Sequence, residues 1–333
     1  MRRLFASGFV GPLAALILVT IVVALTTNRF LDTGNISNLI LQVSIVAIVA
    51  IGSTVVIISG GIDLSPGSAI ALMTMVFAMA VKFWGIPLAA AIPLVLVLGA
   101  LLGAINGALT AYLRIPSFIT TLAALSAFRG VAFMFNNGSP VFSVDPNLEM
   151  IFYGTLFGVP LPLFYVVGLC AVFHAMLHYT AFGRTLYAVG GNPNAAVLSG
   201  LNVAGIRFAA FVVAGVLTGI GAVLMAARLN SGSPNYGVGM ELSAIAAAVI
   251  GGASLAGGRG SVVETVIGAL TIVIVQNALN LNAVPASAQS VVIGAIIVTA
   301  VALDVWRGEV GRTVMRLFVH APPPTPSRPR KDS

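Results

Sequence analysis

The chain has 333 residues, of which 59% are hydrophobic and only 8% are charged, and its mean hydropathy is +1.07. A soluble globular domain carries about 25% charged residues, so this composition excludes an ordinary soluble protein. The net charge of +7 would suit nucleic acid, but the positions of the basic residues along the chain favour a membrane protein instead.

The first apolar stretch runs from Phe9 to Leu25 and follows Arg2 and Arg3. It is longer than the hydrophobic region of a secretory signal, which has about 7–15 residues, and no small-x-small cleavage site follows it. We therefore predict a retained membrane-spanning helix rather than a targeting segment.

Further apolar runs of the length needed to cross a bilayer, about 20 residues, continue along the chain. They predict about ten membrane-spanning helices, at residues 10–27, 38–58, 68–83, 87–112, 116–135, 161–179, 207–228, 241–256, 262–282 and 287–305. The runs at 68–83 and 241–256 are short for complete spans, so we expect them to be tilted or discontinuous. The expected fold class is an all-α polytopic membrane protein.

Basic residues gather on one side of this predicted topology. With the N-terminus inside, the inner set is Arg2, Arg3, Arg114, Arg184, Arg207, Arg259, Arg307, Arg312, Arg316, Arg328, Arg330 and Lys331, and the outer set is Arg29, Lys82 and Arg228. Because cytoplasmic loops carry the excess of Lys and Arg, the pattern predicts that both ends are cytoplasmic (N-in, C-in) and that the number of spans is even.

The chain is expected to form a single transmembrane domain, residues 1–320, with a disordered Pro-rich basic cytoplasmic tail at 321–333. Two breaks between spans are long: an outer one at 136–162 and an inner one at 180–206. A shorter outer loop is expected at 229–240.

The stretch IISGGIDLSPGS, residues 57–68, interrupts a long apolar run. Glycine and proline break helices, and a carboxylate is costly in hydrocarbon. We predict a helix break, followed by a helix that has Ser65 as N-cap and Pro66 in its first turn. Asp63 has two interpretations: it holds the turn at the inner membrane edge, which we favour, or it lines or gates a pathway. Gly60, Gly61 and Gly67 belong to the same candidate site.

Some short motifs recur. SGGIDLSPG (59–67) resembles IGGASLAGG (250–258), and NGSP (137–140) resembles SGSP (231–234). These echoes are compatible with the duplicated halves of many transporters. Chance matches are equally compatible, because 36 residues are glycine.

Polar residues within the predicted spans are further pathway candidates. Arg129 lies deep within a predicted span, so we expect it to have a functional role unless its side chain reaches outward to the membrane interface. Gln276, Asn277 and Asn280 share a helix, and for these we favour bonds between helices over substrate binding. Asn106 is a similar case, and Glu241 is expected at the outer start of a helix, where the dipole suits a carboxylate.

Catalytic and metal chemistry are not expected. His174 and His178 are spaced i, i+4 but have neither an adjacent Glu nor a third ligand. No nucleophile–base or acid–base pair stands out, and the lone Cys170 has no disulfide partner. The GxxxxGK[ST] phosphate loop is absent, so any ATP-driven motor must be another subunit.

The inner loop at 180–206 favours a partner. NPNAAVLSG predicts a short helix capped by Asn192, with Pro193 at its first position. A short helix between two spans is suited to a groove on another protein. The alternative is an ordinary surface loop.

Three long motifs occur together and in order: SGGIDLSPGS, AFGRTLYAVGGNPNAAVLSGLNV, and ELSAIAAAVIGGASLAGGRGSV followed by GAL. In these the chain, from about Phe30 to Asp304, resembles permease subunits of bacterial carbohydrate-uptake ABC transporters of the ribose, xylose and galactofuranose type. The resemblance implies a type II importer fold of about ten helices in the bacterial inner membrane. It also implies a second permease subunit, the same or a related chain, a pair of cytoplasmic ATPases that hold ATP and Mg, and a periplasmic binding protein that delivers sugar. This chain would be a non-catalytic subunit that binds no cofactor.

By the same resemblance, the segment from Arg184 to Gly200 is the coupling segment that engages the ATPase. Its candidate residues are Gly183, Arg184, Gly190, Gly191, Asn192, Ala195, Ala196 and Gly200. The outer loops at 136–160 and 229–240 would face the binding protein. Two departures from the family pattern are Pro66, where a small aliphatic residue is usual, and Glu264, where a glycine is usual. Glu264 puts tight packing there in doubt, and we expect it to pair with Arg259.

The expected function is therefore sugar import by alternating access, driven by separate ATPases. The main alternative is a stand-alone secondary transporter or channel for a small polar solute, which would need ion-coupling carboxylates deep in the membrane. A purely structural membrane subunit is disfavoured by the breaks and polar residues in the spans.

Overall fold

The computed structural model describes residues 9–319 of the protein, with side chains up to residue 302. The tail predicted at 321–333, like Arg2 and Arg3, lies outside the described residues.

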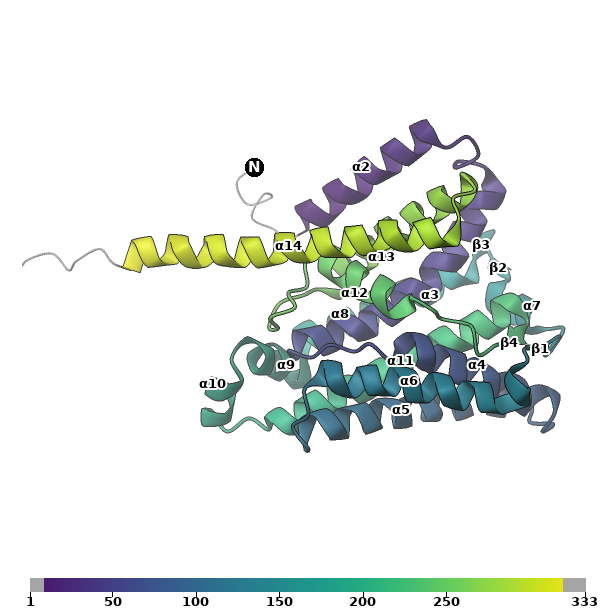
Figure 1. Cartoon of the computed structure of the whole chain (residues 1–333), viewed down its shortest axis with the longest axis horizontal. Coiled ribbons are helices and arrows are strands. Elements are labelled where there is room, and N and C mark those ends of the chain that lie inside the picture. Colours follow the sequence, from purple (N-terminus) through teal and green to yellow (C-terminus); the bar gives the residue numbers. More distant parts are fainter. Residues whose placement is uncertain (1–8, 320–333) are drawn as a thin grey trace, which may run out of the picture.

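The predicted spans all correspond to helices (Figure 1). They are α2 (Val10–Thr26), α3 (Thr33–Ile58), α4 (Pro66–Lys82), α5 (Leu88–Ala111), α6 (Ser117–Met134), α8 (Leu161–Tyr179), α11 (Val203–Leu229), α12 (Met240–Ile250), α13 (Val262–Leu281) and α14 (Ala286–Val319). Within the described residues, 6 helices are long and apolar enough to cross a membrane: α3, α5, α6, α8, α11 and α13. Two helix ends differ most from the prediction: α14 continues to Val319 rather than ending at residue 305, and α12 ends at Ile250 rather than at residue 256 because the glycine-rich stretch after it forms turns.

Short elements lie at the two ends of the helix bundle. One end carries α9 (Ala181–Gly191) and α10 (Pro193–Leu198). The other end carries η1 (Phe135–Gly138), α7 (Leu148–Tyr153), β1 (Val141–Phe142), β2 (Thr155–Leu156), β3 (Val159–Pro160) and β4 (Ser231–Gly232). Strand β1 pairs antiparallel with β4, and β2 with β3. The two NGSP-like segments therefore meet at one small ribbon, and the duplication inferred from them stays a prediction.

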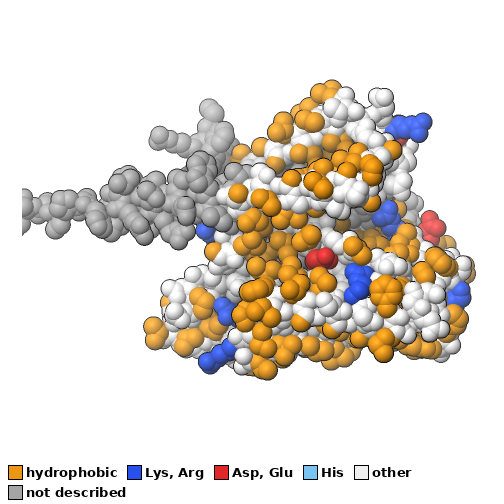
Figure 2. Space-filling view, viewed as in Figure 1, with side chains coloured by type: hydrophobic (Ala, Val, Ile, Leu, Met, Phe, Trp, Pro, Cys, Tyr) orange, Lys and Arg blue, Asp and Glu red, His pale blue; other side chains and the backbone are white. Residues whose placement is uncertain are grey.

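Helix α3 forms the centre of the bundle. Every residue from Val43 to Ile58 is buried, and α3 packs against α11, α13 and α12. A helix that is apolar all round is expected in such a position. In contrast, α5, α6 and α8 expose large apolar side chains such as Leu101, Phe118 and Val167. Figure 2 shows extensive apolar patches on the face in view, as expected for a surface that contacts lipid.

Helices α5 and α11 make the most extensive pairing in the bundle. Gly99, Gly103 and Gly107 lie on one face of α5, and a Cβ added at Gly215 of α11 would be 2.1 Å from the carbonyl oxygen of Gly99. Small residues at this spacing let two membrane helices approach backbone to backbone. The pairing holds α11 against the helix that carries Asn106.

Candidate functional site

The first helix break follows α3. The chain turns at Gly60, whose φ of +83° favours glycine, and residues 61–65 are not helical. The carboxylate Oδ1 of Asp63 accepts hydrogen bonds from the backbone N–H of Ser65 (2.8 Å) and from its hydroxyl (2.7 Å). Asp63 is buried. The turn-holding interpretation of Asp63 therefore agrees with the geometry.

Ser65 is the N-cap residue of α4 and Pro66 lies in its first turn, as predicted, but the Ser65 side chain does not cap the helix. Ser65 precedes α4 with helical dihedral angles, φ −89° and ψ −16°, and its hydroxyl makes no capping bond. An N-cap needs extended angles to aim its oxygen at the first turn. Asp63, two residues earlier, accepts from the N–H of Ser65 itself, in the manner of an Asx turn.

Side chains of α5 and α6 complete the polar surroundings of the break. Asn106 Nδ2 donates to the hydroxyl of Ser65 (2.9 Å), the Ser117 hydroxyl accepts from the N–H of Ile62 (3.0 Å), and the Thr121 hydroxyl donates to the carbonyl of Ile62 (3.2 Å). Non-helical backbone in a membrane protein needs such partners. Sequence reasoning missed Ser117 and Thr121, although their i, i+4 spacing at an apolar helix start was a usable signal.

The second helix break, residues 251–261, connects α12 to α13. A Cβ added at Gly251 would be 2.5 Å from the carbonyl oxygen of Glu264, so the backbones of α12 and α13 touch there. Glu264 fits at this position because the glycine that close approach requires, Gly251, lies on the other side of the contact, at the end of α12. The expected pair with Arg259 is wrong, since no ion pair joins the two side chains in the part of the chain that is described.

Both breaks meet the end of α9 at Gly190. A Cβ added at Gly190 would be 1.7 Å from the carbonyl oxygen of Ile58 and 2.7 Å from the N–H nitrogen of Gly258. Those two groups are themselves hydrogen-bonded at 2.9 Å. Three backbone segments that are far apart in the sequence therefore touch at one point, which only a glycine can occupy.

Tyr187, one helical turn before Gly190, adds a side-chain bond to this junction. Its hydroxyl donates to the carbonyl of Gly260 at 2.7 Å. Burial and the nearby carboxylate of Glu264 raise the pKa of Tyr187, so the phenol keeps its proton at neutral pH and remains a donor.

The predicted short helix in the inner loop is α10, and it starts as expected. The side chain of Asn192 accepts a hydrogen bond from the N–H of Ala195 (3.0 Å), and Pro193 occupies the first turn. Among the other coupling candidates, Gly183, Gly190 and Ala196 are buried, whereas Arg184, Gly191, Ala195 and Gly200 are exposed. The segment thus has one face on the bundle and one face free.

Only part of the loop expected at 229–240 lies at the end of the helix bundle. A Cβ added at Gly232 would be 2.3 Å from the carbonyl oxygen of Thr74, and one added at Gly237 would be 2.4 Å from that of Gly67. The chain therefore runs back alongside α4, from its middle to its first turn. There α12 begins, so the N-termini of α4 and α12 lie next to each other.

Arg129 of α6 holds this re-entrant segment, residues 233–239. Its Nη1 donates to the carbonyls of Pro234 (2.5 Å) and Tyr236 (2.7 Å). Glu241 is in the first turn of α12, as predicted, but that turn is beside Gly67 rather than at the end of the bundle: a Cβ on Gly67 would be 2.1 Å from Glu241 Oε2.

The polar residues of α13 join helices, as favoured from the sequence. Asn277 exchanges two hydrogen bonds with Asn35 of α3 (3.0 and 2.8 Å), and Gln276 Nε2 donates to the hydroxyl of Ser243 (3.1 Å).

Six of the pathway candidates gather at the first break: Gly60, Gly61, Asp63, Ser65, Gly67 and Asn106. Arg129 reaches this cluster through the re-entrant segment, whereas Asn277 lies apart from it.

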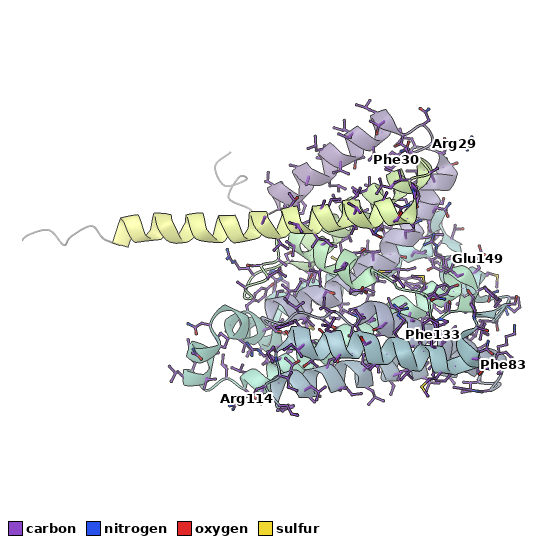
Figure 3. The ribbon with its side chains drawn as sticks, viewed as in Figure 1. Arg29, Phe30, Phe83, Arg114, Phe133 and Glu149 are labelled. Carbon is purple, nitrogen blue, oxygen red and sulfur yellow. The ribbon has the colours of Figure 1, made fainter. Side chains whose placement is uncertain are left out.

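A cavity of about 930 Å³ opens between the first break and α10. Residues 59–62 line one side of it, and Pro193, Asn194 and Val197 line another. Figure 3 shows Arg114, another lining residue, at the α9–α10 end of the molecule, opposite to Arg29, Phe83 and Glu149. The first break and the coupling segment therefore line the same cavity.

Metal-binding chemistry has no candidate in the described residues, which contain no cluster of three or more His, Cys, Asp or Glu side chains able to hold an ion. The rings of His174 and His178 stack on each other, with centroids 4.2 Å apart.

Comparison with known proteins gives a consistent result. Residues 35–301 match the family described as "branched-chain amino acid transport system / permease component". The ribose import permease protein RbsC of Escherichia coli K12 is 42% identical over 316 residues, which cover 91% of this chain and 96% of that protein. RbsC of Bacillus subtilis is 40% identical (88% and 92% covered), and the xylose transport system permease protein XylH of Haemophilus influenzae is 36% identical (84% and 91% covered). No solved structure gives a significant match.

Proposed function

This chain belongs to the family of branched-chain-type transport permease components, a family of non-catalytic subunits, and from that premise we propose that it forms the translocation pathway of an ATP-driven sugar importer. The resemblance to carbohydrate ABC permeases, based on the three sequence motifs, is confirmed by this match together with the similarity to ribose, xylose and allose permeases. Sugar is the proposed substrate class because the similar permeases are named for ribose, xylose and allose. No cofactor is indicated for the family.

We further propose a type II importer fold with about ten helices in the bacterial cytoplasmic membrane and both chain ends in the cytoplasm. The family is one of polytopic membrane proteins, and the described helices agree with that architecture. The positive-inside pattern assigns the α9–α10 end to the cytoplasm and the end with the β-ribbons to the periplasm.

The contact of α9 with both helix breaks is the observation that carries the mechanism. Gly190 touches Ile58 and Gly258 without room for a methyl group. A displacement of α9 by a cytoplasmic ATPase must therefore move the ends of α3 and α12 with it, because packed backbones are not compressible. Alternating access follows as rigid-body movement of helices, with ATP and Mg bound by the ATPase subunits.

The pathway is proposed to lie between this chain and a second permease, the same or a related chain. A periplasmic binding protein would deliver sugar to the opposite end, where the 136–160 segment lies. The first break and the re-entrant segment are the proposed gate of this pathway, since discontinuous helices line the substrate sites of many transporters.

Capture of the ATPase tests the proposal. We would purify the full chain from its native membranes in mild detergent and measure the ATPase that accompanies it. Leu198 on α10 and Phe157 in the β2–β3 turn are 90% and 94% exposed, so Leu198→Asp and Phe157→Asp are a matched pair that leaves the core intact. Leu198→Asp is expected to reduce ATPase capture at least tenfold, and Phe157→Asp to leave it unchanged. Recovery of the chain without any ATPase, with transport intact, would instead establish the stand-alone transporter or channel.

A further inference from the structure

The cavity beside α10 has an unusual lining. It contains two guanidinium groups, from Arg114 and Arg207, and no carboxylate. Asn194, Asn202 and Ser59 add neutral polar groups, and Phe118 adds an apolar wall. A concave site with two cations and no counter-charge is suited to an anion.

Neither guanidinium is fully used by the protein. Arg207 Nε donates to the carbonyl of Ser59 at 3.4 Å, and a Cβ added at Gly60 would be 3.7 Å from its Nη2. Its two Nη groups have no acceptor among the described residues, and there Arg114 makes no hydrogen bond at all. Both side chains thus keep donors for an oxyanion, which guanidinium binds in a fork geometry.

Exposed apolar side chains border the cavity just after the end of α5 and at the start of α6. Leu113 is 63% exposed, Phe118 51% and Tyr112 55%. They continue the apolar outer surfaces of two helices that are long enough to span the bilayer. A soluble anion would gain nothing from this border, whereas a lipid has acyl chains to place on it and a phosphate to place inside.

We propose that this cavity binds the headgroup of an anionic phospholipid from the cytoplasmic leaflet. The lipid phosphate would lie between Arg114 and Arg207, and its acyl chains would run along Leu113 and Phe118. Basic pockets between membrane helices on the cytoplasmic side are suited to such headgroups. The assignment to the cytoplasmic leaflet rests on the orientation given under the proposed function, but not on coupling to an ATPase.

Lipid binding by the full-length protein tests this site. The protein is delipidated in detergent and titrated with phosphatidylglycerol, phosphatidylethanolamine or inorganic phosphate, and bound molecules are counted by native mass spectrometry. Arg114→Gln is the test variant, because Arg114 has no hydrogen bond whose loss would affect folding. Arg259→Gln is the matched control, since Arg259 is exposed and does not line the cavity.

We expect tight phosphatidylglycerol binding that is weakened about fivefold by Arg114→Gln, which corresponds to about 1 kcal/mol for one arginine near an anionic headgroup. Arg259→Gln should bind phosphatidylglycerol like the unaltered protein, and phosphatidylethanolamine gives the level of unspecific lipid binding. Equal phosphatidylglycerol binding by both variants would overturn the proposal, as would binding of inorganic phosphate with no added effect of the lipid. If Arg114→Gln instead reduces ATPase capture and leaves lipid binding unchanged, the cavity belongs to the partner interface and the lipid site is rejected.

Capture of the ATPase by the unaltered chain is measured separately. A failure of lipid binding therefore leaves the proposed function standing, and a failure of ATPase capture leaves the lipid result readable.

Discussion

At the scale of single residues, the charged groups in the bundle serve backbone that has left the helix. Asp63 accepts two hydrogen bonds from Ser65, and Arg129 donates two to the re-entrant segment. Each side chain substitutes for the partners that an unbroken helix would provide, because unsatisfied backbone groups are costly in a membrane.

For Asp63, the oxygen matters more than the charge. Asp63→Ala leaves the buried N–H and hydroxyl of Ser65 without their acceptor, so we expect a loss of about 1–3 kcal/mol of stability. Asp63→Asn keeps an acceptor oxygen and should retain most of it. Thermal unfolding in detergent measures both. Equal losses in the two variants would show that the charge itself is required, as in an ion-coupled carrier.

For Arg129, the expected effect is release of the re-entrant segment. A cysteine replacing the buried Ser233, in a Cys170→Ala background, reports access of a soluble maleimide. Arg129→Met removes two charge-assisted hydrogen bonds of about 1.5–3 kcal/mol each, so labelling should speed up at least tenfold. Arg129→Lys keeps a donor and should fall between. Unchanged labelling of the Arg129→Met protein would refute the anchoring role.

At the scale of elements, the fold relies on two helices that are too short to cross the membrane. Helix α4 has 17 residues and α12 has 11, which correspond to about 25 Å and about 16 Å at 1.5 Å per residue, against a hydrocarbon core of about 30 Å. Their N-termini meet where Gly67 touches Gly237. Because each helix begins inside the bundle, its start can move without unfolding a complete span.

Two neighbouring glycines of α9 test how the coupling segment is connected to these helices. A methyl group at Gly190 would collide with the Ile58 carbonyl, whereas a methyl group at Gly191 meets nothing within 4 Å. Gly190→Ala should therefore cost about 1–3 kcal/mol by overpacking and uncouple ATP hydrolysis from transport, and Gly191→Ala should behave like the unaltered protein. Both are read out by thermal unfolding and by transport per ATP hydrolysed. Similar behaviour of the two variants would mean that the Gly190 contact does not transmit motion.

At the scale of the whole molecule, the exposed apolar surface and the distribution of charge define an orientation. Exposed apolar side chains on α5, α6 and α8 form the surface for lipid, and the two ends of the bundle carry its polar loops (Figures 1 and 2). The proposed orientation places α10 in the cytoplasm and the β2–β3 turn in the periplasm.

Single cysteines at Leu198 and Phe157, again in a Cys170→Ala background, test this orientation. Both positions are highly exposed. In spheroplasts, a membrane-impermeant maleimide should label Phe157→Cys within minutes and label Leu198→Cys only after the membrane is permeabilised. The reverse pattern would invert the topology and move the proposed lipid site to the other leaflet.

Hydropathy alone was enough to locate the helices, because a span in lipid must be apolar over about 20 residues, and Asn192–Pro193 was enough to locate α10, because capping is local. Three features were not predictable from the sequence: the path of residues 233–239 along α4, the hydrogen-bond partners of Arg129, and the Gly190 junction. Each of them joins residues more than fifty positions apart in the chain. Rotation and depth of a helix depend on its packing partners, and these appear only in the tertiary structure. The chain's own chemistry thus determined that it is a helical membrane permease, and tertiary packing decided which residues hold its two helix breaks together.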